Sequence, residues 1–188
     1  MFKKIIAAGL VAGLSATAMA ADTYTADVRH LYPLFEVGHL GLTTQRGRFN
    51  KATAKITLDT AAKTGSVEAT VDTTSLDMGA DDWDKHIKSE DFFNVEKYPT
   101  MTFKSDKFSF DGDSLTAVDG TLTLLGITKP VKLTIVNFKC GTHPANKKPV
   151  CAADVSATIK RSDWGMTKLI PIVSDEVKIS IPVEALKD

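Results

Sequence analysis

The 188-residue sequence lacks a surplus of charge of either sign, since it holds 23 basic and 23 acidic residues. Proteins that bind nucleic acid or an anionic membrane surface through electrostatic attraction usually carry a basic excess. Here the basic side chains are scattered between apolar ones rather than gathered in runs. The composition therefore gives no reason to expect nucleic acid, or an anionic membrane surface, as a partner.

The sequence also lacks the short motifs of common enzymes. It contains no G-x-S-x-G, no H-E-x-x-H and no glycine-rich phosphate loop. Its four histidines show none of the paired spacings that are typical of metal ligands: His30, His39, His86 and His143. We therefore expect no catalytic residues, no metal site and no catalytic cofactor.

The N-terminal apolar run is shorter than the roughly 20 residues that a membrane-spanning helix needs. It covers residues 5–16, follows Lys3 and Lys4, and precedes the small-residue sequence Ala18-Met19-Ala20. This order is typical of a secretory signal peptide, so we expect cleavage after Ala20 and export to the periplasm. Residues 21–188 then form one domain, in which 21 basic residues face 23 acidic ones.

Only two cysteines are present, Cys140 and Cys151, and they flank a turn-rich insert at 141–150. Two strand-like runs border this insert, and an exported protein folds in an oxidising compartment. We therefore expect a disulfide that closes a hairpin lying outside any central channel. A redox-active pair usually has C-x-x-C spacing, which is absent here.

Residues 21–188 alternate between apolar and polar side chains almost throughout, which predicts about eight or nine antiparallel strands, each with one dry face. Short turns, such as Asp111-Gly112-Asp113, separate these runs. Such strands close economically into an up-and-down barrel or a sandwich. With eight strands, the interior of a barrel is either filled by side chains or just wide enough for one small ligand. The alternation alone leaves both outcomes open.

The segment 75–99 interrupts this strand pattern and carries a helical period around residues 83–87. Connections of this length often act as lids or binding loops. The segment contains four large apolar side chains that we expect to cover one end of the barrel: Trp83, Ile87, Phe92 and Phe93.

Several blocks of the sequence, in order along the chain, resemble the YceI-like family of lipid-binding proteins. The blocks are residues 35–41 (FEVGHLG), 86–105 (HIKSEDFFNVEKYPTMTFKS), 120–133 (GTLTLLGITKPVKL), 161–166 (RSDWGM) and 173–177 (VSDEV). The resemblance implies an all-β fold, an extended lipocalin-like antiparallel eight-stranded β-barrel with a short helical segment in one long loop. It also implies that the channel holds a long amphiphile, such as a polyisoprenoid or an isoprenoid quinone.

Inward-facing positions of the alternating runs are the candidate lipid-binding residues. For each of them ordinary core packing is an equally good interpretation. His39 shares the parity of Phe35 and Val37, so it is either a contact for the head group of a ligand or a core histidine satisfied by backbone. The candidates are Phe35, Val37, His39, Phe49, Val67, Ala69, Met101, Phe103, Leu133, Ala157 and Ile179.

Two functions remain for such a barrel. The favoured one is a periplasmic carrier or store for a long-chain lipid, which needs no catalysis. The alternative is a quinone-binding accessory of membrane electron transfer, whose partner would be a membrane cytochrome; a carrier would instead meet other lipid-handling proteins. The sequence leaves the oligomeric state open, a dimer included.

Overall fold

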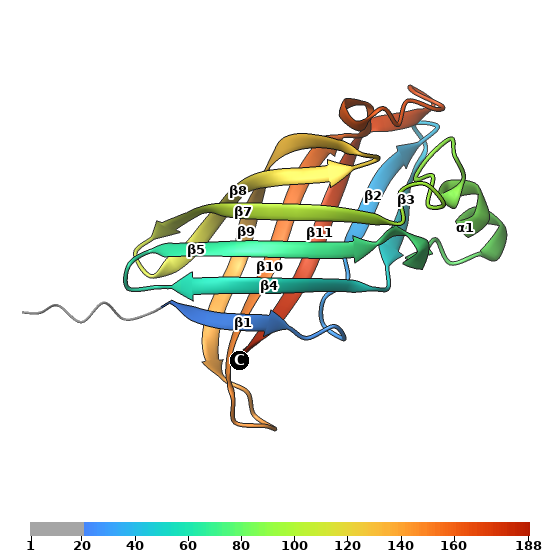
Figure 1. Ribbon diagram of the computed structural model, residues 1–188. Helices are drawn as coiled ribbons and strands as arrows, with labels where there is room; N and C mark the ends of the chain where they lie inside the picture. The colour runs from blue at the N-terminus through green and yellow to red at the C-terminus, as the bar shows by residue number, and fades with distance from the viewer. Residues whose placement is uncertain (1–20) are drawn as a thin grey trace, which may run out of the picture.

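The computed structural model describes residues 21–188, so the predicted signal peptide at 1–20 lies outside the described residues. No helix within 21–188 is long and apolar enough to cross a membrane. Eleven strands form one sheet, with a short α-helix, α1, at Asp81–Lys88 (Figure 1). The strands are β1 Asp22–Ala26, β2 Leu34–His39, β3 Thr43–Phe49, β4 Ala52–Asp59, β5 Thr64–Asp72, β6 Leu76–Asp77, β7 Thr100–Asp111, β8 Ser114–Leu124, β9 Ile127–Thr142, β10 Pro149–Lys160 and β11 Val173–Lys187.

Eight of these strands close into an antiparallel barrel in the order β1-β4-β5-β7-β8-β9-β10-β11, and β11 returns to β1. The expected eight-stranded antiparallel barrel is thus confirmed. The order is not simply sequential, because β1 pairs with β4 rather than with β2. Strands β2, β3 and β6 continue the sheet from β11 outside the closed ring.

The long strand β11 makes this arrangement possible. Its Val177–Ser180 part pairs with β2, and its Ala185–Lys187 part pairs with β1. Sheet twist separates the two partners, so one edge of β11 serves both of them in succession. The β2–β3 hairpin thereby extends the barrel beyond the ring, toward the end that carries α1 (Figure 1).

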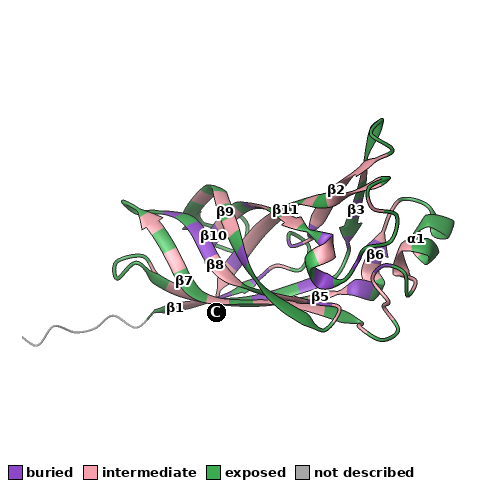
Figure 2. Ribbon diagram, turned by 90° about the horizontal axis from the view of Figure 1, so that it is seen from above, coloured by how far each residue is buried: buried purple, intermediate pink, exposed green. Residues whose placement is uncertain are grey.

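The buried apolar residues form two main clusters, one toward each end of the barrel, instead of one continuous core. One contains Tyr24, Leu58, Cys151 and Ala185, and the other contains Leu124, Val131 and Trp164. Many other strand residues are only half-buried (Figure 2). In strand β11, for example, Val177, Ile179 and Ile181 are half-buried, while Lys178 and Ser180 between them are exposed. A closed barrel leaves inward residues half-buried when its middle is hollow.

The segment 75–99 closes one end of the molecule, as expected, and contains the predicted helix as α1. Phe93 lies against Phe35 and Phe49, with ring centroids 6.2 and 5.3 Å apart. Phe92 is also buried, at 6% exposure. Trp83, which we expected to cover the barrel, is instead 36% exposed, and no residue of α1 is fully buried.

Candidate functional site

An apolar cavity of about 200 Å³ lies inside the barrel between the two core clusters. Side chains from eight strands and from the connection after β1 surround it. The lining residues are Tyr24, Leu31, Pro33, Ala54, Ile56, Leu58, Val67, Val71, Met101, Phe103, Phe108, Leu115, Val118, Leu122, Val131, Leu133, Ile135, Phe138, Cys151, Ala152, Ala153, Val155, Ile179, Ile181, Val183 and Ala185.

Five of the candidate residues lie together in this lining, on strands that are far apart in the sequence. They are Val67 on β5, Met101 and Phe103 on β7, Leu133 on β9 and Ile179 on β11. Alternation alone predicts this convergence, since every second side chain of a barrel strand points inward. Their role as ligand contacts stays a prediction.

The remaining candidates lie near the cavity or at the α1 end. Ala69 packs against the cluster that contains Tyr24, and Ala157 packs against the cluster that contains Trp164. Phe35 and Phe49 belong to the aromatic group around Phe93, with their own centroids 5.9 Å apart. Val37 and His39 lie on β2, in register with Val177 and Val173 of β11.

Sequence reasoning missed several lining residues for identifiable reasons. Leu31 and Pro33 lie in the connection between β1 and β2, where no alternation marks them. Phe108 has the opposite parity to Phe103, because an irregularity between Lys104 and Lys107 adds a residue to β7 and switches its face. Ile56 follows the apolar–polar alternation of β4 and should have been included among the candidate residues.

One ionisable side chain, Tyr24, lies in this lining. Burial raises the pKa of its hydroxyl above the usual value, and the nearby Asp22 adds to this shift. Within residues 21–188, no group of three or more histidine, cysteine or acidic side chains is arranged to hold a metal ion. Chemically, the cavity is suited to hold an apolar chain by burial, since its walls offer hydrocarbon and aromatic surface.

Trp164 packs behind the cavity lining, at the end nearest the connection between β10 and β11. It is 2% exposed, and its indole Nε1 donates a hydrogen bond to the carbonyl of Leu122 at 3.2 Å. Its neighbours in the core cluster include Met101, Phe103 and Leu133, which themselves line the cavity. Trp164 is therefore part of the wall that separates the cavity from this end of the molecule.

The adjacent Arg161 holds the connection that follows Trp164. Its buried guanidinium donates hydrogen bonds to the carbonyls of Met166, Lys168, Val173 and Ser174, at 2.9 to 3.0 Å. Burial lowers the pKa of Arg161, and the negative charge of Asp175 partly offsets this effect. The connection 165–173 is thus anchored to the barrel by one side chain.

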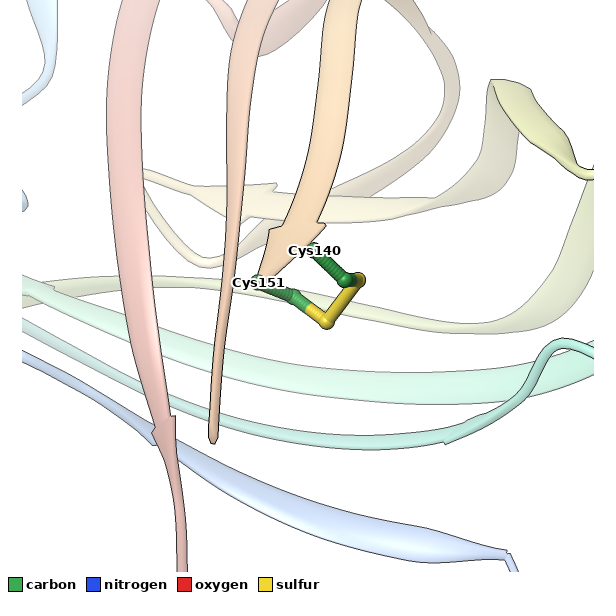
Figure 3. The surroundings of a disulfide bond; sticks show 2 residues. All are labelled: Cys140 and Cys151. Carbon is green, nitrogen blue, oxygen red and sulfur yellow. A yellow bond between two sulfur atoms is a disulfide. The ribbon is translucent and has the colours of Figure 1, made fainter. Parts of the chain in front are cut away.

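The disulfide between Cys140 and Cys151 joins directly paired residues of β9 and β10 (Figure 3). The loop between these strands projects beyond the barrel, as expected (Figure 1). However, Cys151 is 8% exposed and lines the cavity. The loop thus lies outside the channel, but the disulfide itself belongs to the cavity wall at Cys151, because the hairpin strands continue as barrel wall right up to it.

A second hollow, of about 910 Å³, lies on the outer face of the sheet. Exposed charged side chains such as Lys55, Glu68, Lys104 and Lys132 line it. It is open to solvent and its charges are mixed, so it does not offer the enclosed apolar surface that a lipid chain requires. The inner cavity is the better candidate.

Comparison with known proteins gives consistent matches. The model of the YceI-like domain family matches residues 24–185. A UPF0312 protein of Pseudomonas aeruginosa is 35% identical over 193 aligned positions, covering 100% of both chains. A UPF0312 protein of Vibrio cholerae is 40% identical over 149 positions, covering 77% of this chain and 78% of its own.

Solved structures share the fold. BcnA of Burkholderia cenocepacia superposes with a TM-score of 0.68 at 27% identity, covering 85% of this chain and 98% of its own. A polyisoprenoid binding domain from Saccharophagus degradans superposes with a TM-score of 0.66, covering 88% and 98%. Its identity is 15%, so that likeness concerns the fold alone.

Proposed function

Because this chain belongs to the YceI-like family, we propose that it binds a long-chain amphiphilic lipid, such as a polyisoprenoid or an isoprenoid quinone, inside the barrel. In this role the protein is a periplasmic carrier or store and performs no catalysis. The apolar cavity is the observation that carries the proposal. Of its 26 lining residues only Tyr24 has a side chain that can ionise, because the sulfur of Cys151 is held in the disulfide.

The energetics of burial support such a ligand. Each methylene removed from water contributes roughly 0.8 kcal/mol, so ten buried carbons contribute about 8 kcal/mol before the cost of ordering the chain. No polar contact is required to reach useful affinity. A ligand whose main feature is an apolar chain therefore suits this lining better than a sugar, nucleotide or peptide.

The cavity must widen to accept a long chain. Its volume of about 200 Å³ is below the roughly 300–1,000 Å³ of typical ligand pockets. Met101, Phe103 and Phe108 project into it and are only half-buried, so rotation of these side chains can enlarge the space. Methionine adapts particularly easily to a new neighbour, because its side chain is unbranched and flexible.

The fold neighbour from Saccharophagus degradans, a polyisoprenoid binding domain, supports the class of ligand by showing that a barrel of this shape occurs in a protein of that description. The family membership and the apolar lining of this chain supply the remaining support. The periplasmic location in the proposal comes from the order of basic, apolar and small residues at 3–20.

The test is to purify the protein under native conditions from the periplasm and to analyse its organic extract by mass spectrometry. We expect a polyisoprenoid or isoprenoid quinone at near one molecule per protein. A quinone would favour the electron-transfer accessory role, and its reduction on addition of a membrane cytochrome would confirm that role. Recovery of protein with no lipid, together with failure to take up added polyisoprenoid, would contradict the proposal.

A further inference from the structure

Four exposed aliphatic side chains lie on two neighbouring turns at the Trp164 end of the barrel. Leu40 and Leu42 belong to the β2–β3 turn, and Leu169 and Ile172 belong to the connection before β11. Their exposed fractions are 54%, 80%, 41% and 54%. The amide of Leu40 donates a hydrogen bond to the carbonyl of Ile172 at 2.8 Å, so the two turns are joined (Figure 1). We call these four residues the tip patch.

The backbone conformation at Leu40 and Leu169 is one that favours glycine or asparagine over leucine. Leu40 and Gly41 have φ angles of 58° and 67°, a conformation in which asparagine or glycine usually occupies the first position of the turn. Leu169 also has a positive φ, 63°. A leucine in the left-handed region is strained, and its exposed side chain recovers little of that cost by packing in this chain. The two leucines therefore point to a use for their side chains outside the fold.

The tip patch is anchored and lies next to the proposed ligand cavity. Arg161 binds the carbonyls on both sides of Leu169 and Ile172, those of Lys168 and Val173. Trp164, which packs against lining residues of the cavity, directly precedes this connection. The patch is thus held by Arg161 at the end of the barrel where the Trp164 cluster lies.

The two turns are nearly free of charge. Across residues 40–45 and 165–173, the only charged side chain is Lys168, which pairs with Asp91 at 3.2 Å. Farther along the hairpin, Glu36 and Arg46 pair with each other at 2.8 Å. These two stretches therefore carry no carboxylate that would oppose contact with hydrocarbon, and the exposed Asp163 lies just outside them, before Trp164.

We propose that the tip patch docks on the surface of a lipid bilayer, with Leu40, Leu42, Leu169 and Ile172 inserted between the lipid head groups. This inference rests on the proposed function, since a water-insoluble ligand has to leave and re-enter a bilayer. Docking at this end brings the Trp164 cluster, and the cavity lining that it contacts, next to the membrane. The attraction is apolar insertion rather than charge, which agrees with the balanced composition of the chain.

A second copy of this chain is a less suitable occupant. Stable interfaces between proteins bury roughly 1,200–2,000 Å² around a packed apolar centre. The tip patch consists of four side chains on two turns, and the neighbouring exposed strand residues are polar, for example Thr43 and Thr44. A small apolar tip of this kind is typical of shallow insertion into a membrane interface.

The test is flotation of the full mature protein with vesicles of phosphatidylethanolamine and phosphatidylglycerol. Leu42→Glu should lower the vesicle-bound fraction about tenfold, because it places a charge where the most exposed leucine inserts. Val136→Glu is the matched control, since Val136 is 70% exposed on β9, away from the patch, and should change nothing. Binding should also persist at high salt, where electrostatic attraction is screened.

A second variant separates docking from folding. Leu40→Gly with Leu169→Gly removes two patch side chains but suits the positive φ angles, so the melting temperature should hold while vesicle binding falls about tenfold. The proposal is overturned if the wild type does not float, if Val136→Glu loses as much binding as Leu42→Glu, or if Leu42→Glu only abolishes a dimer seen by light scattering. A protein that yields bound lipid on extraction but does not float refutes docking alone, and one that floats without carrying lipid refutes the proposed function alone.

Discussion

The ring of Phe103 lies over the backbone of Gly120. A Cβ atom built on Gly120 would approach Cε2 of that ring to 2.9 Å, and would also strike Cζ of the ring and the carbonyl oxygen of Lys104. Phe103 lines the cavity from β7, and Gly120 belongs to the neighbouring β8. The absence of a side chain at 120 therefore sets how far the Phe103 ring can lie back against the wall.

We expect Gly120→Ala to push the Phe103 ring into the cavity. Overpacking of this kind typically costs about 1–3 kcal/mol, to be measured as the free energy of unfolding in urea. Bound lipid should fall as well. Gly141→Ala on β9 is the control, because nothing lies within 4 Å of its added Cβ, and equal stabilities of the two variants would refute the contact described here.

Val67→Phe should reduce the lipid recovered from the protein more than it reduces stability. Val67 is half-buried and lines the cavity, so a larger side chain at this position can occupy empty space. In a packed core the same substitution would cause steric overlap. Thr70→Phe, on the outer side of the same strand, should leave the lipid content unchanged. A fall in melting temperature without any change in copurified lipid would indicate a solid core and would count against the carrier role.

Replacing both cysteines by serine should lower the free energy of unfolding by about 3 kcal/mol, as expected for a loop of this length. The cysteines are 11 positions apart in the sequence. Because Cys151 also lines the cavity, we expect a modest loss of bound lipid, which sequence reasoning alone did not predict. Two free thiols in the untreated protein on denaturing alkylation would show that the disulfide does not form.

Stability should be constant from pH 7 down to about 5 and should fall below about pH 4. Hydrogen bonds from Thr74 lower the pKa of Asp72, and hydrogen bonds from Ser162 lower the pKa of Asp175. A carboxylate whose pKa is lower when folded contributes stability above its unfolded pKa of about 3.9, and this is lost as the pH falls through the folded value. Thermal melts across the acid range test this, and a marked loss between pH 7 and 5 would contradict it.

Alternation of apolar and polar residues predicted the strands and the barrel well, because every wall strand has one dry face. It predicted Val67 and Ile179 as inward residues for the same reason. Phe108 and Phe138 were missed, because irregularities in β7 and β9 reverse the face of each strand partway along. Such a reversal depends on how two strands pair, and no single run of residues reveals it.

The strand order was also beyond the sequence. Strand β11 pairs with β2 through Val177–Ser180 and with β1 through Ala185–Lys187. Because β11 therefore lies between β1 and β2 in the sheet, β1 takes β4 as its other neighbour. Strands β1 and β11 lie at opposite ends of the chain, so their pairing follows from the twist of the whole sheet. Local patterns establish that strands exist but leave their neighbours undecided.

The seam between β1 and β11 governs the order in which the chain can acquire its structure. On the β11 side Tyr24 pairs with Lys187, 163 positions farther along the chain, while on its other side it pairs with Ile56 of β4. Strand β11 is the last of the eleven strands in sequence order, so the edge of β1 that faces it stays unpaired until Ala185–Lys187 have been synthesised and can close the ring. Such an edge recruits other chains, and pairings this distant form slowly. Deleting residues 185–188 removes the partner of this β1 edge and should turn monomers into aggregates.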